Sequence, residues 1–239
     1  MIPVPRTPQP SAITRNSAKW LRKVGEARAN LNATLADPSK TESDIKQAQG
    51  KLKQALEKYR HDDIKNALIE MFSGKCAYCE SKINHITYGA IEHFRPKGDP
   101  AFEHLAFEWT NLLLSCDICN DAGHKGTNFP VDSAGNPLLI DPTDGITDPN
   151  THLDFSWDKV AGLASVYGRD IRGQEVERIF ELNRKELLKI RSLHVKSLIA
   201  LLELAKTGHI EAVALLKESC EPDAEYSAFA LIHIQPHIP

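Results

Sequence analysis

Apolar residues follow a helical spacing in the first third of the chain. They recur at three- and four-residue steps from Trp20 to Leu35 and again from Ile45 to Tyr59. This spacing gathers the apolar side chains on one face of an α-helix. The pattern therefore predicts two antiparallel helices within residues 16–74.

Helix-ending and helix-starting residues mark the limits of these two helices. Asp37-Pro38 ends the first, because the residue before a proline avoids the helical conformation. The sequence TESD at Thr41 has the form of a capping box and predicts the start of the second. We expect a break near His61 and a C-terminal cap at Gly74.

The rest of the chain has mixed patterns. Alternation and glycines in residues 152–168 predict a β-hairpin, and helical periodicity returns in 176–208 and near 210–216. Of the short apolar runs in the middle, 109–116 predicts a helix turn and 136–142 a strand. We expect four parts: a flexible proline-rich arm (1–15), an N-terminal helical pair (16–74), a zinc-bound subdomain (75–149), and a hairpin with C-terminal helices (150–239).

Composition is that of an ordinary globular protein. The chain has 239 residues, of which 41% are hydrophobic and 26% charged, and its formal net charge is -3. A protein that coats nucleic acid usually carries a basic excess, so any phosphate-binding face must be local.

The first ten residues lack the apolar core of a signal peptide, and no later run is apolar for long enough to span a bilayer. We expect a cytoplasmic protein.

Four of the five cysteines form two pairs with metal-ligand spacing. The pairs are Cys76/Cys79 and Cys116/Cys119, each with two intervening residues. Four thiolates in two such pairs are the set that tetrahedral zinc prefers in closed structural sites. We therefore predict a structural Zn²⁺ that stabilises a small subdomain. The fifth, Cys220, is expected to be a core residue on a helical face.

Polar residues of the types used in catalysis lie between and just after the cysteine pairs. The segment IEHFRPK contains an adjacent carboxylate and imidazole followed by two cations, and WTNLLLSCDICN contains two asparagines. The residues concerned, in chain order, are Glu92, His93, Arg95, Lys97, Asn111, Asn120, His124 and Lys125. An imidazole titrates near neutral pH, so His93 is suited to general acid–base chemistry.

This order of residues resembles the HNH nuclease family. The blocks CAYCE, IEHFRPK, WTNLLLSCDICN, LIDP and ELNRKELLKIR are similar to the HNH subunits of Septu and retron-associated antiphage systems, from about residue 60 to about residue 200. The resemblance implies a mainly α protein with a small ββα-metal subdomain. It also implies phosphodiester hydrolysis, with His93 as the general base.

The resemblance assigns roles to the other residues. It implies that Glu92 and Asn120 bind a catalytic divalent ion, and that Asn111 fixes the loop bearing His93. Oxygen ligands favour Mg²⁺ or Mn²⁺. Many family members have aspartate at the first position and histidine at the last. The lysine that usually follows in the family is displaced here by DAGH, so His124 is an alternative ligand, with Asn120 preferred.

The cations and the biological role have alternative interpretations. Arg95, Lys97 and Lys125 are expected to bind backbone phosphates, although Arg95 and Lys97 also fit a solvated surface. We expect a metal-dependent HNH endonuclease that acts as an antiphage effector. The resemblance implies an ATPase partner and, in retron-associated systems, a retron RNA and DNA. The alternatives are a non-catalytic zinc-stabilised module that binds nucleic acid or protein, and a stand-alone restriction-type or homing DNase. The sequence leaves open whether the substrate is DNA or RNA.

Overall fold

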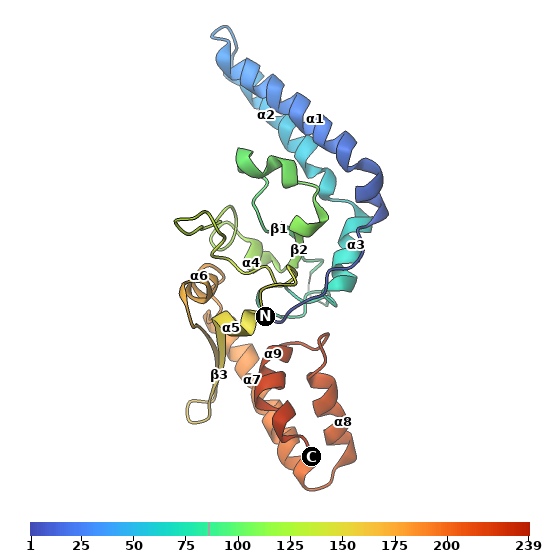
Figure 1. The fold of residues 1–239 in the computed structure, drawn as a ribbon, viewed down its shortest axis with the longest axis vertical. Helices are drawn as coiled ribbons and strands as arrows, with labels where there is room; N and C mark the ends of the chain where they lie inside the picture. Colours follow the sequence, from blue (N-terminus) through green and yellow to red (C-terminus); the bar gives the residue numbers. More distant parts are fainter. Residues whose placement is uncertain (86) are drawn as a thin grey trace. The chain divides into compact units, whose positions relative to one another are not determined.

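The computed structural model describes residues 1–85 and 87–239 (Figure 1). About half of the chain is helical, and the described strands form two two-stranded sheets, β1-β2 and β3-β4. The helical character expected from the sequence is therefore confirmed. Among the described residues, no helix combines the length and the apolar composition required to cross a membrane.

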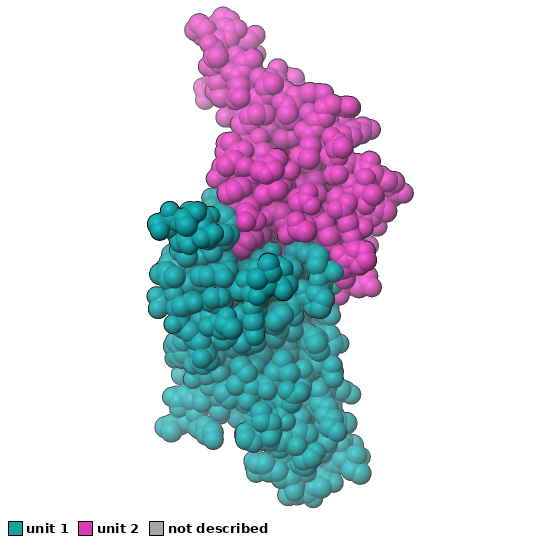
Figure 2. All heavy atoms as spheres, in the orientation of Figure 1, with its two compact units in different colours: residues 1–6, 71–90, 114–239 teal, residues 7–70, 91–113 magenta. Residues whose placement is uncertain are grey.

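The chain divides into two compact units, each built from separate stretches of sequence (Figure 2). Unit 1 comprises residues 1–6, 71–90 and 114–239, and unit 2 comprises residues 7–70 and 91–113. The expected division at residues 15, 74 and 149 follows chain order, whereas these units do not. Strands β1 (Ala90–His93) and β2 (Leu112–Ser115) pair with each other, and the unit boundary falls within both.

Unit 2 contains the predicted helical pair. Its helices are α1 (Ser11–Ala36) and α2 (Glu42–Leu56), which lie side by side in Figure 1, followed by η1 (Glu57–Tyr59) and most of α3 (Asp62–Met71). The capping box is confirmed, because Thr41 and Asp44 each accept a hydrogen bond from the other's backbone N–H.

One apolar core joins this helical pair to the remainder of unit 2. Val24 and Leu31 of α1 and Leu52 and Leu56 of α2 are buried together with Phe107. The short helices η2 (Pro100–Leu105) and η3 (Trp109–Asn111) flank Phe107. Arg28 of α1 makes a two-point ion pair with the carboxylate of Glu103 on η2, which fixes the segment that follows the IEHFRPK motif.

Unit 1 contains the predicted hairpin. Strands β3 (Leu153–Asp158) and β4 (Leu163–Gly168) are antiparallel, with Leu153 opposite Gly168 and Asp158 opposite Leu163. The other helices of this unit are α4 (Asp117–Asn120), α5 (Pro149–His152), α6 (Ile171–Ile179), α7 (Lys185–Lys206), α8 (Ile210–Ser219), α9 (Ser227–His233) and η4 (Gln235–His237).

Two helices replace the continuous helical run expected in residues 176–208. The helix α6 ends at Ile179, and α7 begins at Lys185. Glu181 between them has a φ of 41°, in the left-handed region, which interrupts a right-handed helix. The buried side chain of Arg191 on α7 donates a hydrogen bond to the carbonyl of Leu182, which lies between the two helices (2.9 Å). This bond stabilises the non-helical segment between α6 and α7.

Other local expectations have different outcomes. The strand expected at 136–142 is wrong: this segment contributes only one isolated bridge, between Val131 and Pro137. The helix turn expected at 109–116 is confined to η3, since β2 follows directly. Cys220 is buried in the core formed by α7, α8 and α9, as expected.

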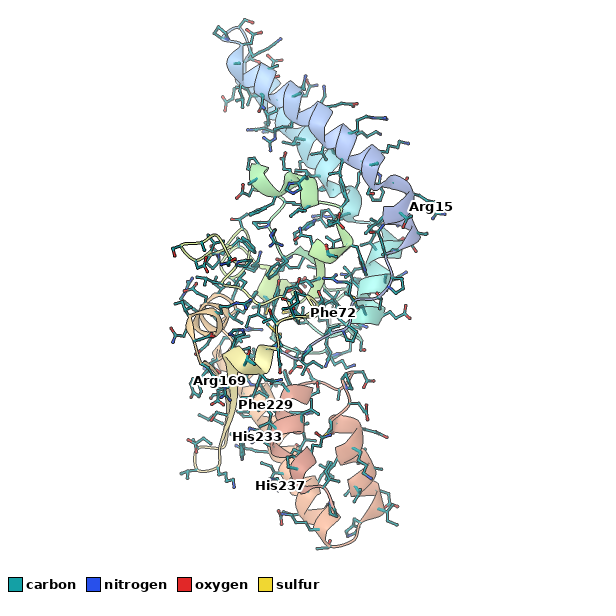
Figure 3. All side chains as sticks on the ribbon, in the orientation of Figure 1. Arg15, Phe72, Arg169, Phe229, His233 and His237 are labelled. Carbon is teal, nitrogen blue, oxygen red and sulfur yellow. The ribbon has the colours of Figure 1, made fainter. Side chains whose placement is uncertain are left out.

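Packing between the hairpin and the last helix completes unit 1. Phe229 and His233 lie one turn apart on α9 (Figure 3). The ring of Phe229 contacts that of Phe155 on β3 edge to face, and the His233 ring is hydrogen-bonded to the Phe155 carbonyl (2.6 Å). The helix α9 lies within the expected C-terminal helical region and is held on the hairpin by these contacts.

Candidate active site and metal centre

His93 is the last residue of β1 and lies inside unit 2. Its side chain is buried, and Nε2 lies 3.0 Å from the carbonyl oxygen of Ala106. A carbonyl oxygen only accepts hydrogen bonds, so Nε2 carries the proton in this contact. In the neutral ring Nδ1 then holds the lone pair. This is the protonation state that a general base requires.

A tyrosine positions the same ring. The rings of Tyr59 and His93 meet edge to face, with centroids 4.5 Å apart and an interplanar angle of 89°. The ammonium group of Lys97 lies 4.7 Å from the Tyr59 centroid, within the range of a cation–π interaction. We did not expect a role for Tyr59 near His93, because its only signal in the sequence is its position at the end of a helical pattern.

Asn111 ties down the loop that follows His93. Its Oδ1 accepts a hydrogen bond from the backbone N–H of Arg95 (2.8 Å), and its Nδ2 donates to the carbonyls of Arg95 (3.0 Å) and Leu105 (3.2 Å). The backbone carbonyl of Asn111 accepts from the N–H of Phe94 (2.9 Å). The buried amide therefore fixes the backbone two residues beyond His93.

The other predicted residues of unit 2 differ in exposure. Glu92 is 3% exposed, adjacent to His93 on β1. Arg95 and Lys97 are half-buried, in the loop that Asn111 holds. Unit 2 therefore brings the candidate base, the candidate carboxylate ligand and two candidate phosphate-binding cations onto one strand and its following loop.

The four cysteines converge in unit 1. The sulfurs of Cys76, Cys79, Cys116 and Cys119 all lie within 4.8 Å of one another. Zn–S bonds of about 2.3 Å in tetrahedral geometry separate two sulfurs by roughly 3.8 Å. The distance between Cys79 Sγ and Cys116 Sγ is 3.9 Å. The donor set and its spacing fit a structural zinc ion.

Backbone hydrogen bonds shape the two cysteine pairs. In the first pair, the N–H of Glu80 donates to the carbonyl of Cys76 (3.0 Å), and the N–H of Ala77 donates to the carbonyl of Leu114 on β2 (2.8 Å). In the second, Cys116 is the N-cap of α4, and its sulfur accepts from the N–H of Cys119 (3.4 Å). The end of β2 therefore brings the two pairs together.

The four thiols do not share one electrostatic environment. Hydrogen bonds from the thiols of Cys116 and Cys119 lower the pKa of the Cys79 thiol well below its ordinary value, whereas burial raises the pKa of the Cys76 thiol well above it. Arg184 Nη1 lies 3.9 Å from the sulfur of Cys119. Burial alone would lower the pKa of Arg184, but the charges of Cys119 and Cys79 hold it above its ordinary value. Arg184 is a neighbour of the metal centre that we did not expect from the sequence.

The last predicted residues follow the second cysteine pair in unit 1. Asn120 ends α4 and is half-buried. His124 Nε2 lies 3.6 Å from a carboxylate oxygen of Glu181. Lys125 has no exposed surface, and its ammonium group lies 6.0 Å from the centroid of the Phe129 ring. A phosphate-binding side chain requires access to solvent, so Lys125 suits this role less well than Arg95 and Lys97.

Comparison with known proteins gives similarity to a single kind of protein. The chain is 34% identical over 185 residues to Septu protein PtuB of Bacillus mycoides (strain KBAB4), covering 68% of this chain and 59% of that protein. It is 33% identical over 186 residues to Septu protein PtuB of Bacillus thuringiensis, covering 69% of this chain and 65% of that protein. This chain is similar to Septu protein PtuB.

The similarity covers only part of each relative's length. The chain spans about three fifths of the length of the PtuB proteins that it matches. No family model matches the chain. No solved structure matches it either.

Proposed function

We propose that the chain is a metal-dependent HNH endonuclease and a component of a Septu-type antiphage defence system. The observation that carries this proposal is the setting of His93. Its ring donates a hydrogen bond from Nε2 to a backbone carbonyl, and the loop beyond it is fixed by the buried amide of Asn111. The bond from Nε2 fixes the tautomer in which Nδ1 carries the lone pair, as a general base requires.

In this proposal each residue has a defined part in phosphodiester hydrolysis. His93 Nδ1 takes the proton from the attacking water, and the contact with Ala106 stabilises the imidazolium that forms. By the resemblance to the HNH family, Glu92 would be a ligand of a catalytic Mg²⁺ or Mn²⁺, which would supply positive charge for the phosphate oxygens. Arg95 and Lys97 bind the neighbouring phosphates. The ββα-metal assignment rests on the chain order β1, β2, α4.

The biological setting is proposed from similarity. Two relatives carry the name Septu protein PtuB, which supports a defence role for this chain. We propose that an ATPase subunit is its partner, with a retron RNA and DNA as further components in retron-associated systems. The four-cysteine centre would hold structural zinc and would take no part in the reaction.

The test is a cleavage assay with a matched pair of histidine variants. Purified protein is incubated with supercoiled DNA, single-stranded DNA and total RNA, in Mg²⁺ or Mn²⁺. His93→Ala should abolish cleavage, whereas His104→Ala should retain it, because His104 is an exposed histidine of the same unit. Zinc content is measured for each variant, so that loss of cleavage is not confused with loss of the metal centre.

The outcomes separate the alternatives. Full cleavage by His93→Ala would overturn the proposed catalytic role. A non-catalytic zinc module would bind nucleic acid equally well with and without His93 and Mg²⁺. It would not cleave, even when the ATPase is added. Cleavage by wild type, with no ATPase recovered in a pull-down from the native host, would favour a stand-alone DNase.

A further inference from the structure

The helices α1 and α2 carry a strong positive charge in a chain that is negative overall. Residues 11–60 contain eleven lysine or arginine residues and five aspartate or glutamate residues, a net charge of +6, whereas the formal charge of the whole chain is -3. Charge asymmetry of this size favours an anionic partner at the basic segment.

The positive charge is concentrated on the exposed faces of the two helices. The buried faces hold apolar residues such as Val24 and Leu52. Arg15, which Figure 3 labels on α1, is followed at helical spacing by Lys19 and Arg22. We define the cationic surface as the exposed residues Arg15, Lys19, Arg22, Lys23, Lys46, Lys51, Lys53 and Lys58.

Few acidic groups neutralise this surface. There is no aspartate or glutamate in residues 11–25 or in residues 45–56. Within the described part of the chain, no ion pair joins the four lysines of residues 46–58 to a carboxylate. Arg22 and Glu26 form an ion pair of 3.6 Å with both side chains about two-thirds exposed, and such pairs contribute little. The cations are therefore available to an incoming ligand.

The form of the surface indicates which anion it fits. An α-helix of 26 residues is about 39 Å long, slightly more than one turn of a DNA duplex. Binding of single strands typically uses exposed aromatic rings on which bases stack. The aromatic residues of this region are turned inward: Trp20 packs against Phe107, with centroids 5.2 Å apart, and Tyr59 is buried.

We propose that the cationic surface binds the phosphate backbone of a nucleic-acid duplex. Lysine and arginine side chains that contact phosphates give sequence-independent affinity that depends strongly on salt. The surface belongs to the same unit as His93, Arg95 and Lys97. The role of this surface in holding a substrate rests on the proposed nuclease function. Its binding to a duplex does not depend on that function.

The test compares two quadruple variants with the same change in charge. One replaces Lys46, Lys51, Lys53 and Lys58 with glutamine; the control replaces Lys159, Lys189, Lys206 and Lys217, which are exposed lysines of unit 1. Both are made in the His93→Ala background without added divalent ions, and circular dichroism checks the helical content. Affinity for a labelled 30-base-pair duplex is measured by fluorescence anisotropy across a salt series.

The expected result is specific to the first variant. At about 100° per residue, Lys46 and Lys53 lie on one side of α2. Lys51 of α2 and Lys58 of η1 lie on another. If the duplex contacts one of these pairs, the slope of log K against log salt should fall by about 2, with about a tenfold loss of affinity at low salt. The control should keep the slope of the parent. Equal losses in both variants, or none in either, would overturn the proposal.

Further arms separate the type of ligand from the chemistry. DNA and RNA duplexes and a single strand of equal length are compared, and a single strand bound as tightly as the duplexes would overturn the assignment to a duplex. If the wild-type protein cleaves and the lysine changes do not alter duplex binding, the nuclease proposal stands and the duplex-binding proposal is refuted. If duplex binding depends on the lysines and the wild-type protein never cleaves, the duplex-binding proposal stands and the nuclease proposal is refuted.

Discussion

The side-chain amide of Asn111 is hydrogen-bonded to both the backbone N–H and the backbone carbonyl of Arg95, at 2.8 and 3.0 Å. These two bonds hold the chain in register two residues beyond His93. The role of Asn111 is thus separable from proton transfer: the amide acts on the backbone. The role of Asn111 is therefore tested by protein stability as well as by activity.

We predict that Asn111→Ala lowers the free energy of unfolding by about 1–3 kcal/mol, because a backbone N–H and two backbone carbonyls, all partly buried, lose their partner. Urea unfolding measures the change. The control is Asn32→Ala on the exposed surface of α1, for which we expect a change within about 0.5 kcal/mol. Equal stability of the two variants would show that the amide does not hold the loop.

The cysteine cluster predicts a metal content that depends on specific thiols. Cys76→Ser and Cys119→Ser should each reduce bound zinc from one ion per chain and should make the protein sensitive to chelators, because the metal stabilises the fold that presents its ligands. Cys220→Ser is the control, since Cys220 is a buried cysteine outside the cluster. Elemental analysis measures the zinc, and a loss in Cys220→Ser equal to that in the others would contradict the assignment.

Local signals in the sequence predicted the elements that depend on nearby residues. The capping box at Thr41, the hairpin of residues 153–168 and the meeting of the four cysteines all follow from spacing within short segments. The strand expected at 136–142 failed because an apolar run needs a partner strand, and only one isolated bridge forms nearby.

Contacts between distant segments were not predictable in the same way. Tyr59 meets His93 across 34 residues of sequence, and Arg184 reaches Cys119 across 65. No periodicity within one segment specifies such pairs. The burial of Lys125 was also missed, because its charge suggested an exposed side chain. The sequence therefore predicted the candidate ligands and the candidate base, whereas their neighbours required the structure.

We predict that Arg184→Gln weakens zinc retention. A zinc ion with four thiolates has a net charge of -2, and the guanidinium 3.9 Å from Cys119 offsets part of it. We expect about a tenfold faster transfer of zinc to a colorimetric chelator, and a change in the thiolate charge-transfer band of the cobalt-substituted protein. Arg178→Gln, an exposed arginine paired with Glu175, is the control. Unchanged transfer in Arg184→Gln would refute this role.

Asp63 provides a prediction about acid stability. Pro10 at the start of α1 makes no side-chain cap, and the Asp63 carboxylate accepts hydrogen bonds from the N–H of Ala12 (2.9 Å) and the hydroxyl of Ser11 (3.0 Å). These bonds, the one from Ala12 first, lower the pKa of Asp63. A carboxyl group with a lowered pKa in the folded state stabilises the fold above its unfolded pKa of about 3.9.

That contribution should be lost as the pH falls through the lower folded pKa. We therefore expect Asp63→Asn to reduce stability at pH 7 and to narrow the difference from wild type as the pH drops below about 4. Thermal unfolding from pH 7 to pH 3 measures both curves. Asp62→Asn serves as the control, because Asp62 is an exposed neighbour in the first turn of α3. A constant difference between Asp63→Asn and wild type over this range would mean that the capping carboxylate is not the group that titrates.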